Sequence, residues 1–224
     1  MSSNHNGDMG RMAEMIRTAK ACGADIAKFQ LYDTDKLIRD PKYLPTLRRG
    51  QLSLAQWHLI VEECVHTGIE YLASPFDVER VGWCQEALMQ RYKVSSFDIY
   101  NEPLLEAIVG TGKDIIMSLG MMDKRGFPTV KGTHIDYLYC VSKYPTELSD
   151  LRFDTVDFKK FSGFSDHTIG IAASVMAMAR GARIIEKHFT LDKTLDGWDH
   201  QLSMDASDLK ELDKYRRDFE EIRH

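Results

Sequence analysis

The feature of the sequence that most constrains the fold is a pair of histidines, each placed directly after a short apolar segment. His167 follows Gly-Phe-Ser-Asp, and His188 follows Ile-Ile-Glu-Lys. Residues 169–180 between them are rich in Ala, Met, Ile and Val, and Gly181 stands where a helix would end. This order of strand, helix and strand predicts a βαβ unit with two parallel strands.

Because both strands of such a unit run in the same direction, His167 and His188 are predicted to converge at one edge of the sheet. Two neutral imidazoles at neighbouring strand ends suit a divalent first-row metal ion. A single histidine in such a place is more often a core or surface residue. The occurrence of two at equivalent strand ends favours metal binding.

Strand-like and helix-like segments alternate along the rest of the chain. Strands are predicted at residues 26–31, 71–76, 92–96, 114–118, 135–142, 161–165 and 182–187. Helices are predicted at residues 8–22, 54–67, 78–90, 101–111, 169–180 and 205–223, whereas residues 32–50 and 121–134 are predicted to be irregular and 147–160 a helix or a turn-rich crossover. Alternation of this kind is typical of a parallel sheet with helices outside it.

Seven strands, each followed by a crossover, predict an α/β fold of the (β/α)₈ or TIM barrel class that lacks one strand. The gap is at the amino terminus, where residues 4–7, Asn-His-Asn-Gly, resemble a loop that leaves a strand and enters a helix. We therefore expect that the first strand is missing from this chain or is replaced by a segment that the pattern does not reveal. The length of 224 residues fits a single catalytic domain spanning residues 1–224.

The composition excludes several classes of protein. The net charge of −5 leaves no basic field for nucleic acid. No apolar run is long enough to cross a membrane and no signal peptide is apparent. The four cysteines form no CxxC pair and are read as reduced thiols. These observations predict a soluble, cytoplasmic protein.

Polar side chains are predicted at nearly every strand end, which is where barrels of this kind place their active sites. They are Lys28, Gln30, Ser74, Lys93, Ser96, Ser118, Ser142, Tyr144, Ser165, His167, Lys187 and His188. Hydroxyl and ammonium groups stabilise anionic oxygens, so the set predicts a pocket for a small ligand that bears phosphate and carboxylate. Serines also end strands because they favour turns, but five of them with two inward lysines favour the anion site.

Six motifs, in this order, resemble those of the sialic acid synthase family, which includes N-acetylneuraminate, legionaminate and pseudaminate synthases. They are Asn-His-Asn-Gly, Ile-Ala-Lys-Phe-Gln, Ala-Ser-Pro-Phe, Tyr-Lys-Val-Ser-Ser, Gly-Phe-Ser-Asp-His-Thr-Ile-Gly and Ile-Glu-Lys-His-Phe-Thr. The resemblance covers nearly the whole chain. It implies a (β/α)₈ barrel that condenses phosphoenolpyruvate with an N-acylated amino sugar, releases phosphate, and uses a divalent metal ion, typically Mn²⁺.

The resemblance also implies roles for the matching residues. His167 and His188 would bind the metal ion and, with Lys28 and Lys93, would form the catalytic group. Phosphoenolpyruvate would be held by Lys28, Ser74, Lys93, Ser96, Ser118, Ser142 and Ser165. Gln30, Tyr144 and Asp199 would face the sugar.

The sequence departs from the family pattern on the sugar side. A glutamate that precedes the Asn-His motif has no counterpart, Leu119 replaces a threonine, and Tyr139 replaces a histidine. Residues 196–199 read Asp-Gly-Trp-Asp where Pro-Gly-Pro-Asp is common. The family's carboxyl-terminal antifreeze-like domain, which supplies an arginine to the partner subunit, is absent from this chain. A homodimer or a partner chain is therefore expected to complete the sugar side.

Two other interpretations stay open. One is a catalytically silent, truncated barrel that acts as a ligand-binding or subunit module. The expected absence of the first strand and of the second domain motivates it. A third interpretation is another metal-dependent barrel, such as an aldolase or a phosphohydrolase, which replacement of Lys93 would distinguish from the synthase.

Overall fold

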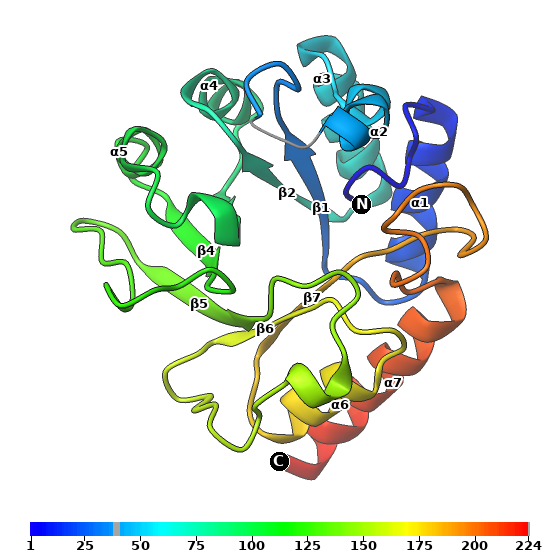
Figure 1. Cartoon of the computed structure of the whole chain (residues 1–224). Coiled ribbons are helices and arrows are strands. Elements are labelled where there is room, and N and C mark those ends of the chain that lie inside the picture. Colours follow the sequence, from blue (N-terminus) through cyan, green and yellow to red (C-terminus); the bar gives the residue numbers. More distant parts are fainter. Residues whose placement is uncertain (38–40, 224) are drawn as a thin grey trace.

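Strands and helices alternate along the chain and wrap around a central axis in the computed structural model, which describes residues 1–37 and 41–223 (Figure 1). The strands are β1 (Ile26–Leu31), β2 (Glu70–Pro75), β3 (Arg91–Val94), β4 (Asp114–Ser118), β5 (Ile135–Cys140), β6 (Gly163–Asp166) and β7 (Ile184–Lys187). The helices are α1 (Met9–Ala21), α2 (Leu44–Gly50), α3 (Leu54–Thr67), α4 (Val78–Glu86), α5 (Glu102–Val109), α6 (Ala172–Ala179) and α7 (Ala206–Arg223), with short 3₁₀ turns at Pro41–Tyr43, Ser96–Asp98 and Leu148–Asp150.

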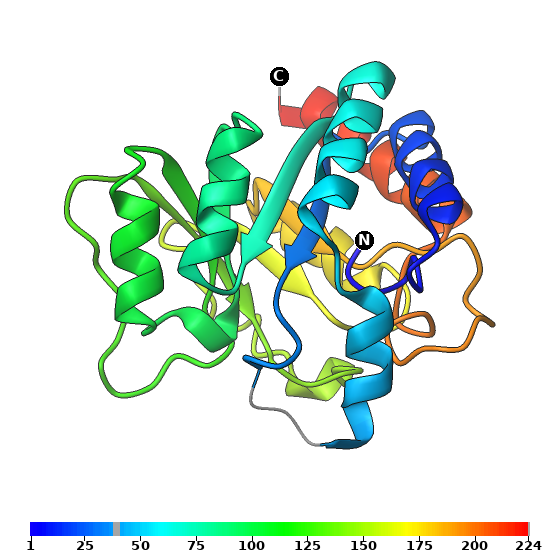
Figure 2. The same ribbon diagram turned by 90° about the horizontal axis from the view of Figure 1, so that it is seen from above.

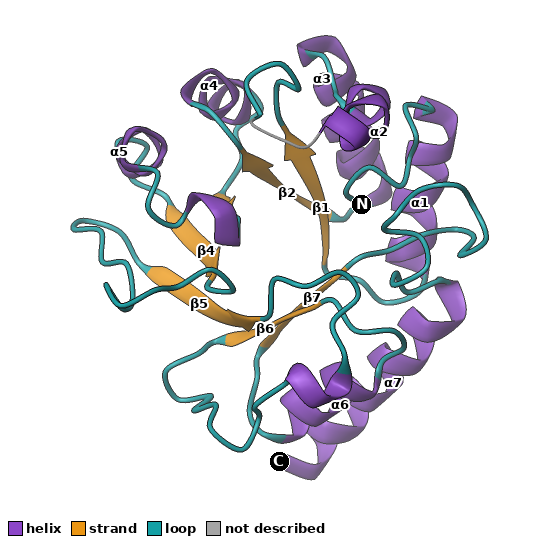
Figure 3. Ribbon diagram, viewed as in Figure 1, coloured by secondary structure: helices purple, strands orange, loops and turns teal. Residues whose placement is uncertain are grey.

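The strands form a half-barrel in which every pair of neighbours is parallel. β1 pairs with β2 in one sheet, and β3 to β7 pair in chain order in a second sheet. Arg91 at the start of β3 makes a bidentate contact with Glu70 at the start of β2, which joins the two sheets. Figure 3 shows the helices outside the ring of strands. The predicted α/β class is confirmed, and the carboxyl ends of the strands share one side of the molecule.

Local sequence accounts for the ends of several helices. Asp8 caps α1 by accepting a hydrogen bond from the Arg11 amide at 3.0 Å. Ser53 and Gln56 form a capping box at the start of α3. Gly68 ends α3 at a φ of 70°, a conformation that a residue with a Cβ rarely adopts. These short-range contacts explain why the predicted bounds of α3 are confirmed.

Apolar side chains fill both sides of the sheet. Between the strands and the helices, Trp57 of α3 is fully buried and contacts Phe29 of β1 edge to face, with ring centroids 5.8 Å apart. Inside the ring of strands, Leu72, Ile116 and Leu138 form a small apolar cluster. The interior is therefore apolar at this level, and the predicted site residues gather toward the carboxyl ends of the strands.

Two predicted features were placed differently by the structure. Residues 41–50, predicted to be irregular, contain a 3₁₀ turn and the helix α2, which has a proline in its first turn. Residues 38–40 of the same predicted segment lie outside the described residues. β3 and β5 end earlier than predicted, at Val94 and Cys140, so Ser96, Ser142 and Tyr144 lie in the turns and loops that follow. Figure 2, turned by 90°, shows α2 beyond the tip of β1.

The first residues of the chain do not form a strand. Residues 2–7 form turns that lead into α1, as predicted for residues 4–7. Met1, Asn4 and His5 are nevertheless buried. The described residues include no helix that is long and apolar enough to span a membrane.

Candidate active site

A cavity of about 490 Å³ reaches the carboxyl ends of the strands inside the ring and also extends to helices α1, α6 and α7. The predicted site residues that line it are Lys28, Gln30, Ser74, Lys93, Ser96, Ser118, Tyr144, Ser165, His167, Lys187 and His188. They come from β1 to β7 or from the residues that directly follow these strands. The structure therefore brings together side chains that are far apart in the sequence.

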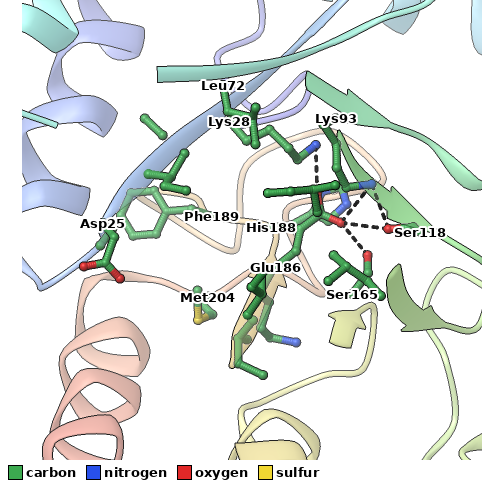
Figure 4. Close-up of a pocket in the computed structure, with 18 of the residues that line it drawn as sticks. Asp25, Lys28, Leu72, Lys93, Ser118, Ser165, Glu186, His188, Phe189 and Met204 are labelled. Carbon is green, nitrogen blue, oxygen red and sulfur yellow. Dashed lines mark hydrogen bonds and ion pairs between the residues drawn. The ribbon is translucent and has the colours of Figure 1, made fainter. Parts of the chain in front are cut away.

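The centre of the polar region is a carboxylate, that of Glu186 on β7 (Figure 4). Its two oxygens contact the lysines, with Oε1 3.3 Å from Nζ of Lys28 and Oε2 3.5 Å from Nζ of Lys93. Two hydroxyl groups also donate to Oε2, from Ser165 at 2.6 Å and Ser118 at 3.3 Å. Four of the seven groups that were predicted to hold an external anion therefore contact an internal one.

Lys93 is held rigidly in this cluster. Its ammonium group donates to Oγ of Ser118 at 2.7 Å and to the carbonyl of Val94 at 2.9 Å. Burial lowers the pKa of Lys93, and the Glu186 carboxylate opposes that shift. Although burial raises it, the ammonium groups of Lys93 and Lys28 hold the pKa of Glu186 well below its usual range. Two cations facing one anion leave an excess positive charge, which favours an additional anionic ligand.

Glu186 was not among the predicted site residues, although the sequence held the information to find it. Successive side chains of a strand point to opposite faces, so an inward His188 implies an inward residue two positions earlier. Lys187, which was predicted at the same rim, has the opposite orientation. Its ammonium group lies 3.1 Å from Oδ2 of Asp166 and donates to the carbonyl of Thr168 instead of joining the anion cluster.

The two histidines lie side by side, as predicted. The ring centroids of His167 and His188 are 5.6 Å apart, and the ring of Tyr144 lies 4.1 Å from that of His167. His167 directly follows β6 and His188 directly follows β7, and these strands are neighbours in the sheet. The convergence of the two imidazoles is therefore a direct result of the βαβ unit.

The contacts of the two Nδ1 atoms suit a metal ion at the Nε2 atoms. Nδ1 of His167 lies 3.1 Å from the carbonyl of Val141, and Nδ1 of His188 lies 3.2 Å from Oδ2 of Asp199. The second contact is close enough for an ion pair, but no aligned hydrogen bond reaches this buried nitrogen. Histidines that bind metals typically direct their other nitrogen at a carbonyl or a carboxylate in this way. The donor set therefore fits a divalent ion.

The protonation of these groups also favours a cation. Burial and the neighbouring His188 imidazole lower the pKa of His167 to about 4, so this ring is neutral near pH 7 and keeps a lone pair. Burial opposes the ionisation of Asp199, but His188 and the hydroxyl of Ser2 lower the pKa of this carboxyl to about 2. Within residues 1–37 and 41–223, no group of three His, Cys, Asp or Glu side chains is arranged to hold a metal ion.

Two predicted residues stand outside the cavity wall. Asp199 lies behind His188, and it accepts a hydrogen bond from Oγ of Ser2 at 2.6 Å. Ser2 itself lines the cavity and lies 3.1 Å from Oε1 of Gln30, so it connects Asp199 with the site. Ser142 is exposed at the rim beside Gly120. The prediction did not include Ser2, because the turn of residues 2–7 gave no sign that it folds over the strand ends.

The sequence matches known proteins along nearly its full length. A sequence model of the NeuB family matches residues 15–223. The chain is 37% identical over 222 residues to an uncharacterised protein of Methanocaldococcus jannaschii, covering 93% of this chain and 66% of that protein. It is 31% identical over 250 residues to the N,N'-diacetyllegionaminic acid synthase of Legionella pneumophila, covering 98% of this chain and 70% of the relative. The chain thus spans about two thirds of the length of these relatives.

A solved structure agrees with this relationship. The fold superposes on an N-acetylneuraminic acid (sialic acid) synthetase from Leptospira borgpetersenii, in complex with citrate, with a TM-score of 0.92 and 31% sequence identity. The match covers 99% of this chain and 82% of that one. The chain therefore belongs to the NeuB family.

Proposed function

We propose that this protein condenses phosphoenolpyruvate with an N-acylated amino sugar to give a nonulosonate of the sialic acid type, with release of phosphate. The observation that carries the proposal is the convergence of Lys28, Lys93, Ser118 and Ser165 beside the His167–His188 pair. The names of family relatives support it, since they include legionaminic, pseudaminic and N-acetylneuraminate-9-phosphate synthases.

The lysine and serine cluster is the proposed site for phosphoenolpyruvate. Phosphoenolpyruvate carries a carboxylate and a phosphate, and the cluster offers two ammonium groups and several hydroxyls. The contacts with Glu186 keep both lysines at the cavity wall before a ligand arrives. Such preorganised donors bind anionic oxygens without the cost of ordering them first. The citrate of the Leptospira relative, also a polyanion, is consistent with an anion site.

The His167–His188 pair is the proposed site for a divalent metal ion, which we expect to be Mn²⁺. The two Nε2 atoms would bind it, while Val141 and Asp199 hold the Nδ1 sides of the rings. When bound, such an ion acts as a Lewis acid that polarises a carbonyl group. Two protein ligands would leave several coordination positions open, as catalytic sites require.

The proposed reaction forms one carbon–carbon bond and exchanges the carbon–oxygen bond to phosphate for one to the oxygen of water. The methylene carbon of phosphoenolpyruvate attacks the aldehyde carbon of the open-chain sugar, whose oxygen takes up a proton. Water then adds to the former enol carbon, and phosphate leaves with its bridging oxygen. Lys28 and Lys93 would orient the donor and stabilise the charge on the departing phosphate, while the hydroxyls of Ser118 and Ser165 bind its oxygens.

The sugar is proposed to bind on the side of Gln30, Tyr144 and Asp199. Ser2 lies within hydrogen-bond distance of both Gln30 and Asp199, so it would connect Asp199, behind the cavity wall, with the sugar side. We propose that the active unit is a (β/α)₈-type barrel in the cytoplasm, as a homodimer or with a partner chain that completes the sugar side. The four buried, free cysteines are consistent with a reducing compartment.

The direct test is phosphate release from phosphoenolpyruvate in the presence of Mn²⁺ and a panel of N-acyl amino sugars. We expect release that depends on both the metal ion and one class of sugar, with one new nonulosonate formed per phosphate. Phosphate release without any sugar would indicate a phosphohydrolase instead. Binding of phosphoenolpyruvate by calorimetry without turnover for any sugar would indicate a silent binding module and would contradict the proposed activity.

The affinity of a variant for Mn²⁺ tests the proposed metal site independently of activity. Asp199→Asn is expected to weaken Mn²⁺ binding by about 10- to 100-fold, because the carboxylate beside Nδ1 of His188 would hold that ring with Nε2 directed at the ion. The affinity can be measured by electron paramagnetic resonance of free Mn²⁺. The matched control is Asp154→Asn, which changes an exposed carboxylate that pairs with Arg152. Equal Mn²⁺ affinity in both variants would count against His188 as a ligand oriented by Asp199.

A further inference from the structure

The parallel ladder between β6 and β7 ends directly before the two histidines. Its last register pair is Asp166 with Lys187, and His167 and His188 are the next residues along the two strands. Successive side chains of a strand point to opposite faces, so Asp166 and Lys187 point to the face opposite the two imidazoles. A contact between their side chains therefore acts on the backbone from which both rings project.

Beyond this pair the two chains have different neighbours. The carbonyl of His167 accepts a hydrogen bond from the Thr146 amide at 2.9 Å, whereas that of His188 accepts one from the Met204 amide at 2.8 Å. Thr146 follows β5, and Met204 lies shortly before α7. The two strands therefore part at the histidines, and the spacing of the imidazoles depends on what joins the strands just before this point.

A buried ion pair joins the strands at this place. Nζ of Lys187 lies 3.1 Å from Oδ2 of Asp166, and the two side chains are 1% and 0% exposed. The same ammonium group donates to the carbonyl of Thr168 at 2.7 Å. Lys187 therefore contacts the residue on each side of His167, and it does so from the strand that carries His188. Because water does not screen buried contacts of this kind, they hold one geometry firmly.

Asp166 closes the turn that contains His167. Its Oδ1 atom accepts hydrogen bonds from both the amide and the hydroxyl of Thr168, each at 2.8 Å. Its Oδ2 atom accepts a further hydrogen bond from the hydroxyl of Ser174 on α6. The carboxylate thus ties residues 166–168 to the helix as well as to β7, and His167 stands in the middle of the tied segment.

The tautomer of His167 depends on the position of this segment. Nδ1 of His167 lies 3.1 Å from the carbonyl of Val141, which can only accept a hydrogen bond. The neutral ring therefore carries its proton on Nδ1 and has its lone pair on Nε2. A shift of the backbone at residue 167 would break this contact, so the tautomer reports whether the ring is in place.

We propose that Lys187 and Asp166 are positioning residues for the metal site, which set the spacing and the direction of the two imidazoles. The inference rests on the proposed function, in which His167 and His188 bind a divalent ion. Lys187 and Asp166 touch neither the ion nor the substrates and act through the backbone of the two ligands. Groups that orient the ligands of a metal ion typically contribute about 10- to 100-fold to its affinity.

The test is the double variant Lys187→Met with Asp166→Asn, which removes both charges and so leaves no unpaired charge buried. We expect its affinity for Mn²⁺, measured by electron paramagnetic resonance of the free ion, to fall by about 10- to 100-fold. Its affinity for phosphoenolpyruvate without a metal ion is expected to stay the same, because Lys28 and Lys93 are held by contacts of their own. An equal loss of both affinities would indicate general loosening of the strand ends and would overturn the proposed role.

The matched control is Leu104→Ala, which truncates a buried side chain of α5, away from β6 and β7 (Figure 1). This variant is expected to lower the midpoint of thermal unfolding, as the double variant does, but to keep the wild-type affinity for Mn²⁺. If the control lost as much Mn²⁺ affinity as the double variant, lower stability alone would account for the effect, and the positioning role would be refuted.

A second measurement requires neither a metal ion nor turnover. The ¹⁵N resonances of the His167 imidazole in the metal-free protein, identified by their loss in His167→Gln, show which nitrogen carries the proton. We expect the proton on Nδ1 in the wild type and in Leu104→Ala, and exchange between the two tautomers in the double variant. A fixed Nδ1 proton in the double variant would contradict the positioning role. If the tautomer changes but even the wild type does not bind Mn²⁺, the pair positions the ring and it is the metal ion of the proposed function that fails.

Discussion

Replacing Lys93 with methionine is expected to weaken the binding of phosphoenolpyruvate by about 10²- to 10³-fold. The ammonium group is almost completely buried and is fixed by Ser118 and the Val94 carbonyl, so water cannot replace it when it is removed. An anionic ligand would then meet the Glu186 carboxylate with only Lys28 to balance both charges. The affinity can be measured by calorimetry without a sugar, so the result does not depend on turnover.

Two further variants test whether the loss of affinity is due to the Lys93 ammonium group itself. Lys36→Met removes an exposed ammonium group that pairs with Glu79, and it is expected to leave the affinity unchanged. Lys93→Met with Glu186→Gln removes the carboxylate that lost its partner, so it is expected to recover thermal stability but not affinity. Wild-type affinity in this double variant would show that Lys93 only neutralises Glu186 and does not contact the ligand.

Lys187→Met is expected to lower the free energy of unfolding by about 3 to 5 kcal/mol, the usual cost of removing one member of a buried ion pair. Lys187 and Asp166 are 1% and 0% exposed, and their charged atoms are 3.1 Å apart. Asp166 also accepts hydrogen bonds from Ser174 of α6 and from Thr168, so its charge would stay buried without a cation. The midpoint of thermal unfolding should fall by about 6 to 20 °C.

The matched control for this prediction is Lys143→Met, which breaks an exposed ion pair with Asp150. It is expected to cost less than about 1 kcal/mol, because solvent screens such pairs. Adding Asp166→Asn to Lys187→Met should recover part of the lost stability, since the remaining partner is then uncharged. A Lys187→Met protein as stable as the Lys143→Met control would show that the Asp166 charge has another source of compensation.

The secondary structure was largely predictable because its determinants are local. β1, α3 and β4 have the predicted bounds. For α3, the Ser53 capping box and Gly68 account for both ends within the helix's own sequence. The helix α2 was missed because the segment around it, residues 32–50, is charged and contains two prolines, which is typical of loops. The early ends of β3 and β5 were also missed, because pairing across the sheet, and not the strand's own sequence, determines where a parallel ladder stops.

The candidate site was predictable only in its outline. Parallel strands deliver their carboxyl ends to one side, so the order of strands was sufficient to place Lys28, Lys93 and the two histidines together. Glu186 and Ser2 were missed for different reasons. Glu186 required the inward orientation of His188 to be extended two residues back along β7. Ser2 required knowledge of how the turn of residues 2–7 folds over Gln30 and Asp199.

The sequence by itself determined the alternation of strands and helices, the convergence of His167 with His188, and the concentration of lysines and serines at the strand ends. These properties follow from chain direction and residue type. The tertiary structure alone decided which anion the lysines contact and which lysine faces outward to Asp166. Those outcomes depend on the packing of segments that are distant in the chain, where burial and charge pairing select one arrangement among several that local sequence allows.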